Sequence, residues 1–155
     1  MAEVFKTLGL VSRGQLVEAD RSKLVAGFAG QTAIKTNQLI DTALGGVLFI
    51  DEAYTLVSGD NDTFGKEAID TLLKRLEDDR GKFICIVAGY TDNMRDFIAA
   101  NPGLQSRFTQ TIQFDDYNPD QLTEIFMNLA KSKNFVCDDK LNEAVHRMME
   151  QHYLR

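Results

Sequence analysis

A chain of 155 residues is long enough for one ordinary domain with a core of its own. Its composition, 44% hydrophobic and 26% charged with two prolines, excludes intrinsic disorder; no apolar run approaches the roughly 18 residues of a membrane span, and no signal peptide opens the sequence. The net charge of -6 argues against general affinity for nucleic acid, and Cys85 and Cys137, far apart and outside any CxxC, indicate free thiols of a cytoplasmic protein.

Helical and strand patterns alternate along most of the chain, with short polar segments between them. In chain order we expect the end of a helix at 2–10 stopped by Gly9, a short strand at 15–19, a helix at 31–44, a buried strand at 47–50, a helix through 68–76 that ends near Gly81, an apolar strand at 83–89 and a further strand at 111–114. Apolar strands that alternate with helices predict an α/β fold with a parallel sheet covered by helices on both faces.

Two amphipathic helices close the sequence. Asn118 can cap the first, with Pro119 in its first turn, and Asp138 can cap the second. The apolar face of the first helix consists of Leu122, Ile125, Phe126 and Leu129. The change to purely helical patterning predicts an α/β core over residues 1–116 and a small helical subdomain that begins at 117.

The strand expected at 47–50 ends in two adjacent acids, Asp51 and Glu52. In open parallel α/β sheets, ligands bind outside the carboxyl ends of the strands, so these acids lie where such a site is expected. One carboxylate can reach a magnesium ion, directly or through water, and the other can polarise an attacking water. The alternative is that the two acids simply begin a surface loop, and the dipeptide alone does not decide between these interpretations.

The flanking residues extend the pattern. The segment "LGGVLFIDEAY", residues 44–54, resembles the Walker B segment of AAA+ ATPases, in the branch that contains the red-type Rubisco activase CbbX and the sporulation protein SpoVK. The resemblance implies an AAA+ P-loop-type parallel sheet with flanking helices and a C-terminal helical lid. It also implies ATP and Mg²⁺ as cofactors, with Asp51 as the magnesium-associated acid and Glu52 as the base that orients the hydrolytic water.

Three further segments resemble the same family. "LVAGFAGQTAIKT" resembles the first pore loop, in which Phe28 would face the channel of a ring; without the family, a loop with a buried Phe is the alternative. "NPGLQSRF" resembles the segment with the arginine finger, here Arg107, which would reach the γ-phosphate held by a neighbouring subunit. "FICIVAGYTDNM" resembles the strand with sensor 1, where Thr91 stands in place of the more common Asn.

The family's phosphate-binding loop, which ends GK[ST], does not occur in these residues. We therefore expect an internal fragment of an ATPase domain, without its first strand and Walker A loop, that is inactive alone. The resemblance implies that the parent is a ring, a hexamer, that remodels or threads a protein partner, with no nucleic acid or membrane involved. Rubisco activation, sporulation and type VII secretion all fit such a parent.

Two other functions are compatible with the residues. A natural pseudo-ATPase would bind partners without nucleotide, although Glu52 and Arg107 would then have no use. A metal-dependent hydrolase could use Asp51 and Glu52, but no His or third acid is spaced to complete its site. In the resembled fold the missing strand lies between the strands at 83–89 and 111–114, so we expect an open apolar edge at 83–89. The segment at 111–114 could close the gap, two chains could pair edge to edge, or the chain could aggregate; we favour pairing between two chains.

Overall fold

The computed structural model describes residues 2–28, 30–57, 59 and 61–153. The chain forms two compact units, Met1–Thr111 and Ile112–Arg155, and each is described by itself. This division falls in a segment without helix or strand, slightly before the boundary expected between residues 116 and 117.

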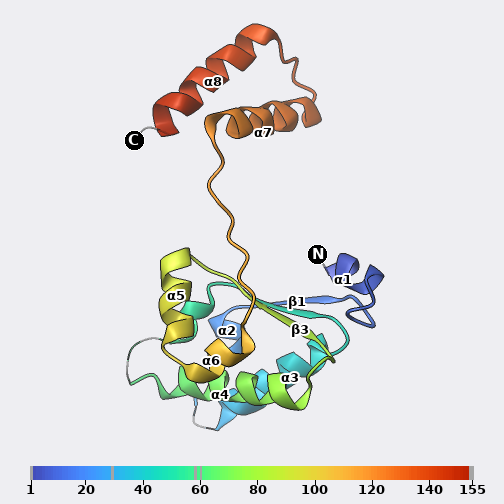
Figure 1. The fold of residues 1–155 in the computed structure, drawn as a ribbon, viewed down its shortest axis with the longest axis vertical. Helices are drawn as coiled ribbons and strands as arrows, with labels where there is room; N and C mark the ends of the chain where they lie inside the picture. The colour runs from blue at the N-terminus through green and yellow to red at the C-terminus, as the bar shows by residue number, and fades with distance from the viewer. Residues whose placement is uncertain (1, 29, 58, 60, 154–155) are drawn as a thin grey trace. The chain divides into compact units, whose positions relative to one another are not determined.

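The first unit contains the sheet (Figure 1). Its elements are α1 (Ala2–Thr7), β1 (Leu16–Ala19), α2 (Arg21–Leu24), α3 (Gln31–Ala43), β2 (Val47–Ile50), the 3-10 turn η1 (Ala53–Leu56), α4 (Thr63–Asp78), β3 (Ile84–Val87), α5 (Thr91–Ala99) and α6 (Pro102–Arg107). The helices expected at 2–10, 31–44 and 68–76 and the strands expected at 15–19, 47–50 and 83–89 are confirmed. The short elements α2, η1, α5 and α6 were not predicted.

The three strands are parallel and lie in the order β1-β2-β3. The register places Ala19 beside Ile50 and Ile50 beside Val87, so the carboxyl ends of all three strands meet at one edge. β2 is the central strand, and its unbroken apolar run suits a position with neighbours on both sides. The parallel α/β fold class is therefore confirmed.

One face of the sheet forms the main core with the helices. Alternate strand residues, among them Leu48 and Ile50, pack with residues of α3 and α4, two helices that lie side by side below the strands in Figure 1. Ile40 on α3 and Leu72 on α4 are 0% and 1% exposed, as expected where an apolar helix stripe meets a sheet.

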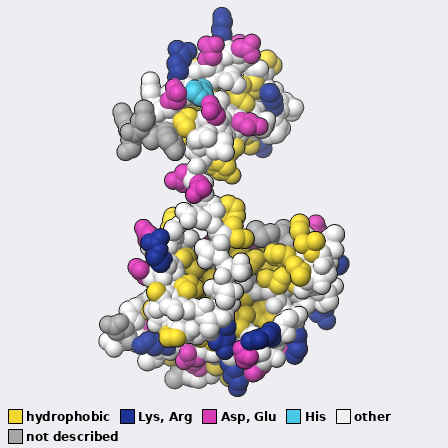
Figure 2. All heavy atoms as spheres, viewed as in Figure 1, with side chains coloured by type: hydrophobic (Ala, Val, Ile, Leu, Met, Phe, Trp, Pro, Cys, Tyr) yellow, Lys and Arg dark blue, Asp and Glu magenta, His cyan; other side chains and the backbone are white. Residues whose placement is uncertain are grey.

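The opposite face is only partly covered among the residues that the structure describes: Val47 is 0% exposed there, but its neighbours on that face are not buried. Leu16 is 50% exposed, and Phe49, Ile84 and Ile86 on the same face are half-buried. Figure 2 shows hydrophobic side chains on the viewed surface of this unit, over the region that the strands occupy in Figure 1. The strand side chains on this face are therefore less buried than expected for apolar strands in a parallel sheet covered on both faces.

The strand expected at 111–114 is also wrong. These residues form no strand, and the side chains of Ile112 and Phe114 are 76% and 82% exposed. β-propensity depends on a neighbouring strand and a surface to pack on, and this segment has neither among the described residues. β3 is therefore an edge strand of the sheet that the structure describes.

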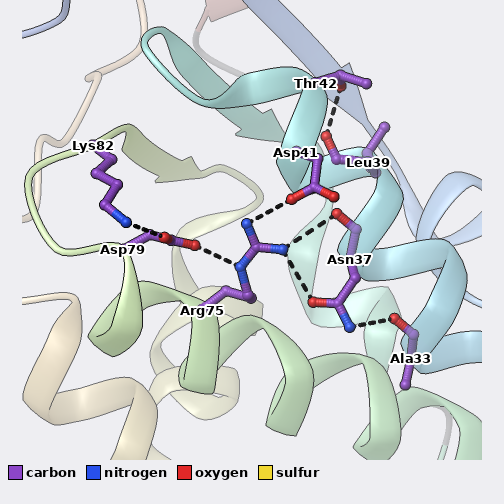
Figure 3. Close-up of polar contacts among 8 residues, drawn as sticks. All are labelled: Ala33, Asn37, Leu39, Asp41, Thr42, Arg75, Asp79 and Lys82. Atoms are coloured by element: carbon purple, nitrogen blue, oxygen red, sulfur yellow. Dashed lines mark hydrogen bonds and ion pairs between the residues drawn. The ribbon is translucent and has the colours of Figure 1, made fainter.

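Arg75 joins α3, α4 and the turn that leads to β3 (Figure 3). Its guanidinium donates to Asp79 Oδ2 at 2.6 Å, to Asp41 Oδ1 at 2.7 Å and to Asn37 Oδ1 at 3.1 Å. Lys82 Nζ then donates to the second oxygen of Asp79 at 2.9 Å. The hydrogen bond from Lys82 and then that from Arg75 lower the pKa of Asp79, and the cluster fixes α4 against α3.

The second unit is a pair of helices, α7 (Pro119–Ser132) and α8 (Asp139–Tyr153). The predicted caps are confirmed: Asn118 and Gln121 form a capping box, and the Leu141 N–H donates to Asp138 Oδ1 at 2.8 Å. The predicted apolar face of α7 remains largely open, since Leu129 is 59% exposed. Two helices alone do not bury both apolar faces.

Candidate active site

Asp51 and Glu52 follow β2 directly and lie at the carboxyl edge of the sheet. The Asp51 N–H donates to Ala19 O at 2.9 Å, which continues the ladder between β1 and β2 by one residue. Both acids are exposed, and the Glu52 N–H donates to Asp51 Oδ1 at 3.0 Å. The two carboxylates are therefore open to solvent at the edge where ligands of parallel sheets bind.

The backbone of Glu52 is left-handed, with φ 46° and ψ 47°. A residue with a Cβ in this conformation costs of order 1–3 kcal/mol unless the surroundings hold it. Here the Thr55 N–H donates to Glu52 O at 2.8 Å, and the Ala53 N–H donates to Ala88 O at 3.0 Å, just beyond β3. The chain reverses sharply at Glu52 and enters η1.

The end of β3 meets this turn through Tyr54. A Cβ on Gly89 would lie 2.8 Å from two ring atoms of Tyr54, so the ring packs where only glycine leaves room. The Tyr54 hydroxyl lies near the side chains of Glu52 and Asn93. Partial burial, and then the Glu52 carboxylate, raise the pKa of Tyr54 above its ordinary value.

Thr91 is the first residue of α5, and its side chain is exposed. The Ala53–Ala88 bond and the Tyr54–Gly89 contact bring the segment around Thr91 to the same edge as the acid pair. Tyr54 and Asn93 join this site although sequence reasoning missed them. The position of Tyr54 within "DEAY" was the available signal, but its direction depends on the turn at Glu52.

Phe28 lies in the segment between α2 and α3, and its side chain is 73% exposed. The alternative of a buried Phe is therefore wrong. Gly27 has nothing within 4 Å of an added Cβ, and Gly30 has φ +77°. Ala29, the other small residue of the expected pore loop, lies outside the described residues.

Arg107 ends α6 and is not brought to the acid pair of its own chain. Its Nη2 lies 3.4 Å from Glu77 Oε2, near the C-terminal end of α4, and its Nη1 donates to Ser106 Oγ at 3.1 Å. Glu77 is about 20 Å along α4 from the end that adjoins η1, at 1.5 Å per residue. Arg107 Nε is buried and has no partner among the described residues.

The acid pair offers few ligands for a metal ion by itself. Among the described residues no group of three or more His, Cys, Asp or Glu side chains could hold a metal. Mg²⁺ in nucleotide sites needs only one or two carboxylates besides the phosphates, so an exposed Asp51 at the sheet edge fits that use. The described helices include none with the length and apolarity to cross a membrane, and Cys85 and Cys137 are free thiols.

The model of one protein family, described as ATPase family associated with various cellular activities (AAA), matches residues 2–116. The chain is 44% identical over 153 residues to the ESX-1 secretion system protein EccA1 of Mycolicibacterium smegmatis, with 97% of this chain and 26% of that protein covered. It is 47% identical over 135 residues to the Stage V sporulation protein K of Bacillus subtilis, with 87% of this chain and 42% of that protein covered. The chain thus spans about a quarter of the first relative and about two fifths of the second.

A solved structure shares the fold. The FIGL-1 AAA domain, crystallised in complex with ADP, has a TM-score of 0.58 and 18% sequence identity to this chain. The likeness covers 86% of this chain and 44% of that chain. At this identity it shows a shared architecture.

Proposed function

Because the chain belongs to the ATPase family associated with various cellular activities (AAA), we propose that it forms part of a ring, a hexamer, that uses ATP hydrolysis to remodel or thread a protein partner. The observation that carries this proposal is the position of Asp51 and Glu52. Both carboxylates are exposed at the carboxyl edge of a parallel sheet, immediately after its central buried strand. Nucleotide sites of α/β sheets lie at this edge.

The two acids have separate roles in this proposal. Asp51 holds Mg²⁺, directly or through water, and Glu52 accepts a proton from the attacking water. Bound Mg-ATP supplies the metal charge and the phosphoryl group. Thr91, at the start of α5, acts as the polar residue near the γ-phosphate in this proposal, where its Oγ can donate one hydrogen bond.

Arg107 acts on the nucleotide of a neighbouring subunit. Its contact with Glu77, about 20 Å along α4 from the end that adjoins η1, favours a role in trans over a role in its own site. An added positive charge at the γ-phosphate stabilises the transition state of phosphoryl transfer. The isolated 155-residue chain contains no GK[ST] segment to hold phosphates, so we expect it to bind Mg-ATP weakly and to be inactive alone.

The partner is a protein, in a cytoplasmic assembly. The named relatives are a secretion-system protein and a sporulation protein, and the exposed Phe28 offers an aromatic contact for a threaded peptide.

The test is Glu52→Gln in an assembled ATPase that contains this chain, with Glu143→Gln on α8 as a matched control at an exposed carboxylate. We expect Glu52→Gln to keep ATP binding and to lower turnover by roughly 10² or more, with the control unchanged. Equal losses of binding and turnover would make Glu52 structural. An unsubstituted assembly that binds its partner but no nucleotide would establish the pseudo-ATPase alternative.

A further inference from the structure

Arg21, the first residue of α2, makes three contacts with the segments around η1. Its Nη1 donates to Thr55 O at 3.0 Å, to Leu56 O at 2.8 Å and to Asp62 Oδ2 at 2.6 Å. Thr55 O and Leu56 O are the carbonyls of the last two residues of η1. The Asp62 side chain is 7% exposed and that of Arg21 is 30% exposed, so this charge pair is largely withdrawn from solvent.

The same contacts bear on the conformation of Glu52. η1 begins at Ala53, so its first residue follows the left-handed Glu52 directly. Asp62 caps α4 by accepting from the Gly65 N–H with Oδ1, while its Oδ2 binds Arg21. Arg21 therefore fixes the far end of the turn whose near end bears the proposed catalytic carboxylate.

On its other side, the segment that begins with Arg21 is fastened to α3. Thr36 Oγ1 donates to Leu24 O at 3.0 Å, and the Ala26 N–H donates to Thr32 Oγ1 at 3.0 Å. Both threonines are 0% exposed, and Lys35 Nζ adds a bond to Val25 O at 2.9 Å. These bonds end one residue before Gly27, where the segment with Phe28 begins.

We propose that Arg21 is a positioning residue that couples the turn bearing Glu52 to the segment bearing Phe28. The functional half of this proposal rests on the proposed ATPase activity, whereas the contacts themselves do not. A displacement of η1 when nucleotide binds would move Arg21 through its hydrogen bonds to η1, and the backbone of α2 would carry the movement on to the Phe28 segment. Coupling of this kind is reciprocal, so a peptide on Phe28 would also bias the Glu52 turn.

The first test is amide hydrogen exchange on the 155-residue chain with Arg21→Ala. Thr55 and Val57 report on η1, since their N–H groups donate within the turn, and Ala26 and Gln31 report on the two ends of the Phe28 segment. We expect both pairs to lose protection about tenfold or more, as for loss of charge-assisted hydrogen bonds. Ile84, whose N–H donates to Gly46 O in the sheet, is the reference and should change little.

The control is Arg95→Ala, which removes an exposed arginine whose ion pair with Asp92 lies within α5. It should leave both pairs of amides unchanged. The proposed coupling would be overturned if Arg21→Ala reduced amide protection only at Thr55 and Val57, or if it reduced protection equally at Ile84. If Arg21→Ala does not fold, Asp62→Asn replaces it in the same experiment, because Asn keeps the helix cap while it weakens the ion pair with Arg21. We then expect protection at the two pairs of amides to fall three- to fivefold.

The second test uses an assembled ATPase that contains this chain, with a non-hydrolysable ATP analogue as the probe. In the unsubstituted assembly and in Arg95→Ala, the analogue should change exchange at Ala26 and Gln31, and in Arg21→Ala it should not. A change that persists in Arg21→Ala overturns the coupling. An analogue that binds none of these proteins contradicts the proposed function instead, and the exchange result on the 155-residue chain still decides whether Arg21 links the two segments.

Discussion

Replacing Gly65 with Ala should destabilise the first unit, although helix propensity predicts the reverse. Gly65 lies in the first turn of α4 and is buried. In a helix Ala is favoured over Gly by about 1 kcal/mol. A Cβ at Gly65 would, however, lie 1.8 Å from Leu56 O and 2.6 Å from Asp62 Oδ2, and the first of these is a backbone atom that cannot rotate away.

The magnitude follows from these two opposing effects. Relief of the contact requires α4 and η1 to separate by more than 1 Å, given that Cβ atoms essentially never approach another atom within 3.0 Å. Overpacking of this kind typically costs 1–3 kcal/mol, and we place this substitution at the upper end because two elements must shift. After the gain in propensity the net loss is about 2 kcal/mol, or roughly 5–10 °C in Tm for a unit of this size.

Thermal unfolding of the 155-residue chain, followed by circular dichroism, measures this difference. The matched control is Gly27→Ala, because an added Cβ at Gly27 meets nothing within 4 Å. We expect the control to stay within about 0.5 kcal/mol of the unsubstituted chain. A Gly65→Ala chain that is as stable as the control, or more stable, would refute the reasoning and show that η1 yields easily.

Three further outcomes are expected. Phe28→Ala should change the free energy of unfolding by less than about 0.5 kcal/mol in a denaturant titration, because the side chain is 73% exposed; a loss of about 3 kcal/mol would restore a buried site. Asp79→Asn should cost about 1–3 kcal/mol at pH 7. The pKa of Asp79 is lowered in the folded chain, so its carboxylate stabilises the fold above the unfolded pKa of about 4, and this stabilisation is lost as the pH falls through the folded pKa. In acid titrations below about pH 4, the free energy of unfolding should therefore fall less in the variant than in the unsubstituted chain. The open edge of β3 should pair with a second chain, as light scattering would detect, whereas a monomer at high concentration with protected Cys85 and Val87 amides would contradict this pairing.

The longer elements could be predicted from the sequence because their signals are local. The apolar run of β2, the stripe on α4 and the Asn118 capping box each lie within one element, and the structure confirms all three. The AAA family, predicted from the resemblance of residues 44–54 and three further segments, is confirmed by the family model. α6 carried local signals too, an Asn101 cap and Pro102 in the first turn, but it is only six residues long.

The missed features depend on contacts between distant parts of the chain. η1 is held by Arg21, more than 30 residues earlier, and the Tyr54 ring packs against Gly89, just beyond the end of β3. The strand expected at 111–114 has the right alternation, yet alternation alone supplies no neighbour. A single sequence shows which residues suit a strand, but the partner strand decides whether one forms.

Glu52 connects the strain in this fold with its proposed chemistry. Two described residues other than glycine have positive φ, Glu52 at 46° and Asn134 at 65°. Asn134 follows the C-terminal end of α7, where asparagine in this conformation is common and needs no further explanation. Glutamate has no such local preference, so a sequence selected only for stability would have Gly or Asn after Asp51. The carboxylate therefore stands at a position that local backbone preference disfavours, which is the pattern expected where a side chain serves catalysis.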